Sequence, residues 1–216
     1  MSEGIFYIAY GESHYFREIK RSVESLRKHC DLPIAIFTDR DFQIDGCMSF
    51  LIETDIEYRA QPKSTDRFRL KLELLKELPF KRTVYVDTDT LFLDDPSKLF
   101  ENNYDIAICR ETRFGNNPEV LPSWFNTGFF VANRNEQYEN LMDKAIFYWD
   151  EFDAGRLERP KDSFGDQFFI NHAITRDLDL TLQVLPQKWN VRRPLLGIIE
   201  QPSLIHCHEI PEEYLT

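Results

Sequence analysis

The sequence predicts an α/β protein with a mixed, mainly parallel sheet flanked by helices. Short apolar segments such as 5–10, 33–39 and 82–87 have the length and composition of buried strands. Amphipathic segments with a helical period, at 13–29 and 66–78, separate them. Strands that alternate with helices in this way are typical of parallel sheets covered on both faces.

The N-terminal half is regular enough to assign each element in turn. We predict strands at 5–10, 33–39, 47–53 and 82–87 and helices at 13–29 and 66–78. Ser13 is in position to cap the first helix. The residues expected to point inward are Phe16, Ile19, Val23 and Leu26 in the first helix and Leu70, Leu74, Leu75 and Leu78 in the second.

The C-terminal half has a less regular pattern. We predict strands at 104–111 and 125–133, helices at 135–152 and 163–174, and short late strands at 180–186 and 203–208. The sequence contains no internal repeat, low-complexity tract or linker. We therefore expect residues 1–216 to form a single domain.

Composition excludes several classes of protein. A formal net charge of −11 argues against a general nucleic-acid binder, because phosphate backbones require a basic face. Basic residues nevertheless gather in segments 61–72 and 187–194, which suits a small anionic ligand. No apolar run has the length of a membrane span, and the first residues lack the features of a signal peptide. With four widely spaced cysteines, these features favour a cytoplasmic protein with reduced thiols.

The stretch VYVDTDTLFL, residues 84–93, places two carboxylates where a buried strand ends. Residues two apart on a strand face the same way, so Asp87 and Asp89 are able to converge on one point. Two like charges that close repel each other unless a cation or a proton lies between them. The pair therefore indicates a Mg²⁺ or Mn²⁺ site next to a phosphate-bearing ligand, with a solvated acidic loop as the alternative.

One catalytic interpretation of this stretch is a phosphatase. VDTDT fits the Asp-x-Asp-x-Thr of haloacid-dehalogenase-type phosphatases, in which the first Asp is the nucleophile. That family carries the motif on its first strand, whereas several elements precede it here. The family also requires a late Gly-Asp-x-x-x-Asp, and the segment GDQFFI ends in Ile170.

A second interpretation rests on four segments taken together. The segments FRLKLELLKELPFKRTVYVDTDTLFLDDPSKLF (68–100), FNTGFFVANRN (125–135), GDQFFIN (165–171) and SLIHCH (203–208) occur in this order. They resemble the helix and Asp-x-Asp, the Asn-Ser/Thr-Gly strand, the Asp-Gln-x-x-x-Asn and the late metal-binding His of glycosyltransferase family 8. The chain is thus similar to nucleotide-diphospho-sugar glycosyltransferases of the GT-A fold, which is Rossmann-like.

This resemblance implies a role for each matching residue. A Mn²⁺ (or Mg²⁺) ion would be held by Asp87, Asp89 and His206, with His208 as the alternative to His206. The nucleotide diphosphate would contact Ala9, Tyr10, Gly11, Thr38, Asp39, Arg69, Lys71 and Thr88. Of the two helix cations, Arg69 is favoured over Lys71, and Arg192 or Arg193 is a further candidate for the diphosphate. The sugar would contact Asn126, Thr127, Gly128, Asp166, Gln167 and Trp189, with Trp124 as a second stacking candidate.

The resemblance also implies the reaction. The expected activity is transfer of a hexose from a UDP-sugar, UDP-galactose or UDP-glucose, to a glycan or another hydroxyl acceptor. Retention by front-face substitution would use Asp166 and Gln167 as the catalytic residues, with Asp166 as a covalent nucleophile in the alternative mechanism. Residues 1–100 would bind the nucleotide and residues 101–216 the sugar and acceptor. A GT-A-like protein that only binds a nucleotide remains the alternative from another functional class.

Overall fold

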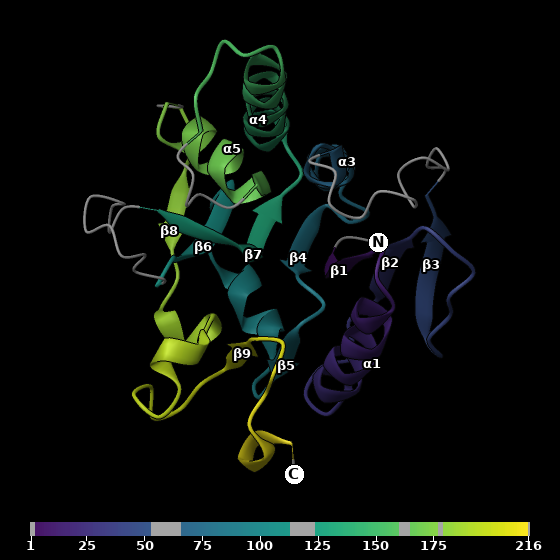
Figure 1. Ribbon diagram of the computed structural model, residues 1–216. Coiled ribbons are helices and arrows are strands. Elements are labelled where there is room, and N and C mark those ends of the chain that lie inside the picture. Colours follow the sequence, from purple (N-terminus) through teal and green to yellow (C-terminus); the bar gives the residue numbers. More distant parts are fainter. Residues whose placement is uncertain (1–2, 53–65, 113–123, 160–164, 177–178, 216) are drawn as a thin grey trace.

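The computed structural model describes residues 3–52, 66–112, 124–159, 165–176 and 179–215 (Figure 1). Within these ranges the main sheet has seven strands in the order β3-β2-β1-β4-β7-β6-β8. Their bounds are β1 Glu3–Ala9, β2 Ile34–Thr38, β3 Cys47–Leu51, β4 Arg82–Val86, β6 Ile106–Arg110, β7 Phe125–Asn133 and β8 Leu182–Val184. This architecture confirms the predicted α/β class with a mixed, mainly parallel sheet.

The order in which strands are added to the sheet reverses at β1: the first strands extend toward one edge, and β4 is added on the other side of β1. Strands β1 to β3 are parallel and extend toward one edge, and β4 then pairs in parallel with the other side of β1. Strand β7 runs antiparallel between β4 and β6, and β8 lies parallel to β6. In open α/β sheets ligands bind beyond the carboxyl ends of the strands at such a switch point.

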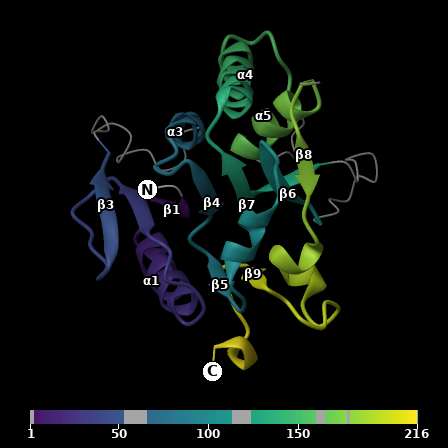
Figure 2. The ribbon, with the colours of Figure 1, turned by 180° about the vertical axis from the view of Figure 1, so that it is seen from behind.

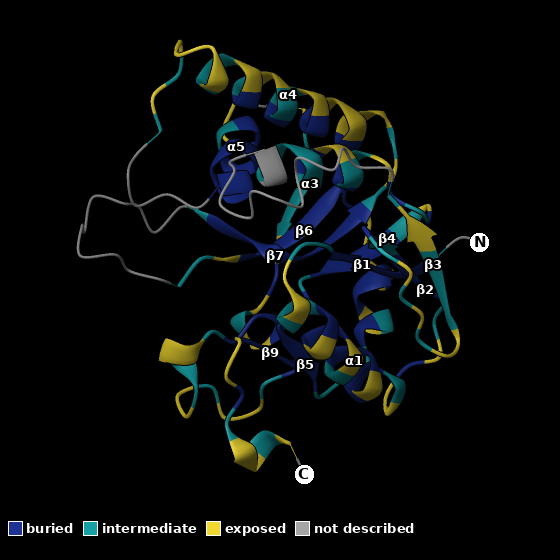
Figure 3. Cartoon of the chain, turned by 45° about the vertical axis from the view of Figure 1, so that its right-hand side comes forward, coloured by how far each residue is buried: buried dark blue, intermediate teal, exposed yellow. Residues whose placement is uncertain are grey.

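Helices cover both faces of the sheet (Figure 3). Helix α1 (Ser13–Arg27) packs on one face, whereas α3 (Asp66–Lys76), α4 (Glu136–Asp153) and α5 (Gly165–Ile174) pack on the other. Strand β1 serves both cores: Ile5 and Tyr7 belong to the α1 side, and Phe6 and Ile8 to the opposite side. Alternate side chains of a buried strand point to opposite faces, which explains its continuous apolar sequence.

Helix faces agree with the sequence pattern in α1 and differ from it in α3. The four apolar residues predicted for α1 are all buried. The helix begins at Ser13 itself after Glu12, whose side chain makes no capping bond, so the prediction of a Ser13 cap was wrong. In α3, Leu72 and Leu75 are buried, whereas Leu70 and Leu74 are only half-buried. The inward face of α3 is therefore rotated from the predicted one, and this rotation matters for the site.

A second, two-stranded sheet fixes the loop after β4. Strands β5 (Thr90–Phe92) and β9 (Leu204–His206) pair antiparallel beside α1, as seen from behind in Figure 2. The hydroxyls of Ser22 and Thr90 lie 2.7 Å apart, and the amide of Phe92 donates to Ser25 Oγ over 2.9 Å. These buried bonds hold the start of β5, and thus residues 87–89, against α1.

Among the described residues, none of the helices combines the length and apolar character that crossing a lipid bilayer requires.

Candidate active site

The two short strands bring residues from distant parts of the chain to the end of β4. Asp87, Thr88 and Asp89 fill the gap between β4 and β5, and Thr90 is paired with His206 across the small sheet. The amide of Cys207 also donates to the carbonyl of Asp89 over 2.9 Å. The late strand ending in His206 is therefore placed against the paired aspartates by backbone pairing.

Asp87, Asp89 and His206 converge on one point. Nε2 of His206 lies 3.2 Å from Asp89 Oδ1 and 3.7 Å from Asp87 Oδ2. One ligand atom from each side chain falls within 4.8 Å of the other two. Asp89 and His206 are buried, whereas the side chain of Asp87 is 29 % exposed and opens toward a cleft.

The contacts of His206 direct its Nε2 toward the paired aspartates. Its Nδ1 lies 2.9 Å from Asn190 Oδ1, and an NH1 donor of Arg192 lies 3.1 Å from Nε2. Asn190 Oδ1 is an acceptor, so Nδ1 donates its proton to Asn190, and Nε2 faces Asp89 and Arg192. A metal-binding imidazole commonly has its second nitrogen held by an acceptor in this way.

Gly128 provides the space in which these groups meet. The amide of Asp87 donates to the carbonyl of Gly128 over 2.7 Å, so β7 passes directly beneath the aspartate. A Cβ at this position would lie 2.1 Å from Cε1 of His206 and 2.5 Å from Oδ2 of Asp87. Two carboxylates and one imidazole around a space that a methyl group would fill fit a divalent cation, with Mn²⁺ suited to the mixed oxygen and nitrogen set.

The neighbouring charges keep Asp89 ionised. Burial alone would raise the pKa of Asp89, but His206, His208 and Arg192 hold it below its usual value. An ionised carboxylate is the form that binds a cation, so Asp89 is ready to act as a ligand without first losing a proton.

Lys71 links the paired aspartates to α5. Its Nζ lies 3.0 Å from Asp87 Oδ1 and 2.9 Å from Asp166 Oδ2. Burial alone would lower the pKa of Lys71, but Asp166 and Asp87 raise it well above its usual value. Tyr85 donates its hydroxyl to the same Oδ1 of Asp87 over 2.6 Å, and burial raises its pKa well above the usual value. Lys71 is thus a charged group inside the site.

Arg69, the cation favoured by the resemblance, pairs outside the cleft. It pairs with Glu73 on its own helix and with Asp150 of α4, 3.0 Å away. Lys71 follows two residues later on the inward side of α3, next to the buried Leu72. The structure therefore reverses the predicted order of these two cations.

The Asn-Thr-Gly segment of β7 contacts the Asp-Gln segment at the start of α5. Thr127 donates its hydroxyl to Asp166 Oδ2 over 3.1 Å, and its amide donates to Gln167 Oε1 over 3.3 Å. Asn171 lies one turn further along α5. Its Oδ1 accepts from the amide of Phe125 at 2.6 Å, and its Nδ2 donates to the carbonyl of Phe125 at 2.8 Å, as a neighbouring strand would. Asn171 thus fixes α5 against β7 and directs Asp166 and Gln167 into the cleft.

Glu111 is a site residue that the sequence analysis did not find. Its Oε2 accepts from Asn126 Nδ2 at 2.7 Å and from Gln167 Nε2 at 3.1 Å. Asn126 in turn accepts from Asn190 Nδ2 at 2.9 Å. A chain of side-chain bonds therefore runs from His206 through Asn190, Asn126 and Glu111 to Gln167. Glu111 stands at the end of β6 outside any recognised motif, and only its position after an apolar strand could have pointed to it.

These residues line one cleft of about 1000 Å³. Predicted residues along its wall are Tyr10, Gly11, Lys71, Asp87, Thr88, Asp89, Asn126, Thr127, Gly128, Asp166, Gln167 and His206. Arg192, Arg193 and His208 line it as well. The cleft opens at the switch between β1 and β4, where an α/β sheet is expected to bind its ligand.

Other predicted residues lie behind this wall. Ala9 is buried at the end of β1, and Thr38 Oγ1 bonds the backbone of Arg40. Asp39 accepts from the amide of Gly11 over 2.9 Å and pairs with Arg40, so it shapes the turn after β1. Gly11 has a φ of 85°, a conformation that this turn requires and that favours glycine.

Neither tryptophan considered for sugar stacking lines the cleft. Trp189 is buried in the core and stacks on Phe129 with ring centroids 6.2 Å apart. Trp124 packs against Phe168 on α5. The prediction that Trp189 stacks on the sugar was wrong, because its ring is buried against Phe129 of β7.

The architecture and the cleft define the class of protein: an α/β fold with a ligand site at the strand-order reversal, built around two carboxylates and an imidazole. Residues 59–193 match the family described as nucleotide-diphospho-sugar transferase, and the chain belongs to this family. The match supports a GT-A-like fold and an enzyme of the glycosyltransferase type. No curated protein matches the chain closely enough to add a named relative.

Proposed function

We propose that this protein is a metal-dependent glycosyltransferase that moves a hexose from a UDP-sugar to a hydroxyl group of a glycan or another acceptor. UDP-galactose and UDP-glucose are the donors proposed first, by resemblance to family 8. The observation that carries the proposal is the convergence of Asp87, Asp89 and His206 in the same cleft as Asp166 and Gln167.

Asp87, Asp89 and His206 would hold the cation. When bound, the ion supplies Lewis-acid stabilisation of the charge that develops on the leaving diphosphate. Arg192 adds a fixed positive charge at the same end of the cleft, because its guanidinium reaches His206. Lys71 holds Asp87 and Asp166 in place and keeps the two carboxylates from repelling each other.

Asp166 and Gln167 are proposed to orient the donor sugar. Both ends of the Gln167 amide are engaged by the protein, by Thr127 at Oε1 and Glu111 at Nε2. An amide is a poor nucleophile, which favours front-face substitution with retention, the leaving phosphate accepting the acceptor's proton. A covalent intermediate on Asp166 is the alternative, and it would require Asp166 to leave its pair with Lys71.

The two halves of the chain are proposed to bind different parts of the substrates. Residues 1–100 are proposed to bind the nucleotide and residues 101–216 the sugar and acceptor, with His206 crossing back to complete the metal site. The phosphatase interpretation is weaker, because the aspartate pair follows β4 and not the first strand.

The test is release of UDP from UDP-sugars by the purified chain in Mn²⁺, followed in parallel with GDP-sugars and in EDTA. We expect slow hydrolysis of one UDP-hexose that EDTA stops and that Asp89→Asn lowers by at least about 100-fold. Asp41→Asn is the matched control, since Asp39 and Asp41 form a second Asp-x-Asp and Asp41 is exposed. Binding of UDP without turnover of any nucleotide sugar would favour the non-catalytic alternative. An initial product in the α configuration, observed by NMR, would support retention.

A further inference from the structure

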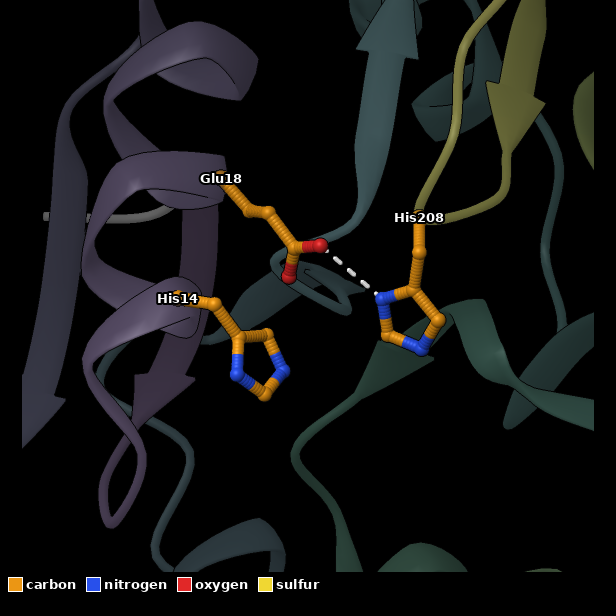
Figure 4. Close-up of side chains that lie close together, drawn as sticks. All are labelled: His14, Glu18 and His208. Atoms are coloured by element: carbon orange, nitrogen blue, oxygen red, sulfur yellow. Dashed lines mark hydrogen bonds and ion pairs between the residues drawn. The ribbon is translucent and has the colours of Figure 1, made fainter.

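Three further side chains with metal-binding atoms meet at the edge of the cleft. Figure 4 shows His14 and Glu18 projecting from α1 toward His208, which follows β9. Nδ1 of His208 lies 2.9 Å from Oε1 of Glu18, and the ring centroids of His14 and His208 are 5.9 Å apart. One nitrogen or oxygen from each of the three lies within 4.8 Å of the other two.

The local sequence explains why these residues come together. His14 and Glu18 are four residues apart on α1, so their side chains lie on the same face of the helix. His208 is two residues beyond His206, and the bond from the Cys207 amide to the Asp89 carbonyl fixes the chain between them. The C-terminal segment is thereby held with the imidazole of His208 directed at α1.

The carboxylates of Glu18 and Asp89 both face His208. Glu18 is buried, with Thr88 Oγ1 3.4 Å from its second oxygen. Within the described part of the chain, no lysine or arginine forms an ion pair with Glu18. Asp89 Oδ2 lies 3.6 Å from Nδ1 of His208, the same nitrogen that faces Glu18. Two buried carboxylates that converge on one imidazole favour a cation at this place.

We propose that His14, Glu18 and His208 form a second cation site, distinct from the Asp87–Asp89–His206 site and suited to a first-row transition ion such as Zn²⁺. Two imidazoles and one carboxylate are a ligand set that Zn²⁺ uses when a fourth position stays open. Tetrahedral bonds of about 2.0–2.1 Å place ligand atoms about 3.4 Å apart, so small side-chain rotations suffice here. The side chains of His14 and His208 are 34 % and 64 % exposed, which leaves the open position facing solvent.

The side chain of Asp89 would lie between the two sites. Its Oδ1 faces His206 and its Oδ2 faces His208. An ion in the second site would tie the segment after β9 to the start of α1 at the rim of the cleft. Because the ligand sets have no residue in common, each site can be removed by substitution while the other keeps its ligands.

The experiment counts Zn²⁺ ions bound to the metal-free full chain by titration calorimetry, with Co²⁺ absorption as a second probe. We expect two Zn²⁺ ions on the wild type, one on His14→Gln and one on His208→Gln. The matched control His29→Gln, at an exposed histidine after α1, should keep both. Asp87→Asn should lose the other ion and retain the one that depends on His14.

A single Zn²⁺ on the wild type that Asp87→Asn abolishes would overturn the proposal, as would two ions on His14→Gln. His14 is half-buried and His208 is exposed, and the folding of both variants is checked by the same melting curve as the control. Binding of UDP with Mn²⁺ to His14→Gln separates this result from the proposed transferase function, because that binding requires only the first site.

Discussion

Replacing Gly128 with alanine would add one methyl group at the centre of the cleft. The new Cβ would lie 2.1 Å from Cε1 of His206 and 2.5 Å from Oδ2 of Asp87, whereas ordinary contacts begin at 3.4 Å. The imidazole would therefore have to retreat by more than about 1 Å, a displacement that costs about 100-fold at a precise site. We expect the affinity for UDP in Mn²⁺ to fall about 100-fold, which equals about 2.7 kcal/mol.

Titration calorimetry of UDP in Mn²⁺ measures this loss, with Gly4→Ala as the matched control. A Cβ at Gly4 would lie 2.5 Å from the ring of Phe80. Gly4 pairs with Thr83 near the start of β4, whereas Asp87 and Asp89 follow the end of that strand. Both substitutions should lower stability by about 1–3 kcal/mol through overpacking. Only Gly128→Ala should weaken UDP binding. Unchanged affinity in Gly128→Ala would refute the assignment of Asp87 and His206 to one metal site.

Three further predictions concern single residues. Asn190→Ala, which frees Nδ1 of His206, should weaken Mn²⁺ binding about 10–100-fold; a titration that matches the wild type would contradict the orienting role assigned to Asn190. Lys71→Met should lower the free energy of unfolding in urea by about 3 kcal/mol because the buried Asp166 and the half-buried Asp87 lose their cation, against less than about 1 kcal/mol for Lys76→Met in an exposed pair with Asp143; equal losses would argue against the buried role of Lys71. The lowered pKa of Asp89 contributes stability above its ordinary value of 3.8 that is lost as pH falls below it. In EDTA, Asp89→Asn should therefore flatten the acid side of the stability profile, and an identical slope would show that Asp89 has no such role.

Much of the fold could be predicted because burial on both faces leaves a simple pattern. Strands β1, β2 and β4 are short apolar runs, and α1 shows one apolar stripe at a helical period. The face of α3 was harder to predict, because its leucines at 70, 72, 74 and 75 allow two overlapping stripes. Arg69 was preferred to Lys71 by resemblance, and the observed rotation of α3 places Lys71, not Arg69, in the site.

The site was predictable only where a motif marks it. Asp87 and Asp89 stand out because charge follows an apolar strand, and His206 was found through resemblance. Glu111 and Asn190 gave no such signal, since each gains its role from partners 15 or more residues away. Pairing of β5 with β9 decides which histidine meets the aspartates, and these three-residue strands are too short for their register to be read from sequence.

The central claim is that Asp87, Asp89 and His206 bind the metal that a nucleotide diphosphate needs. Thermal melting of the purified chain with UDP, GDP, ADP or CDP, each in Mn²⁺, Mg²⁺ or EDTA, tests it most directly. Ligand at about 100 times its dissociation constant adds about 2.7 kcal/mol, a rise in Tm of roughly 5–10 °C for a chain of this size. We predict this rise with UDP and Mn²⁺ and its loss in EDTA and in Asp89→Ala. No rise with any diphosphate, or a rise that persists in Asp89→Ala, would contradict the claim.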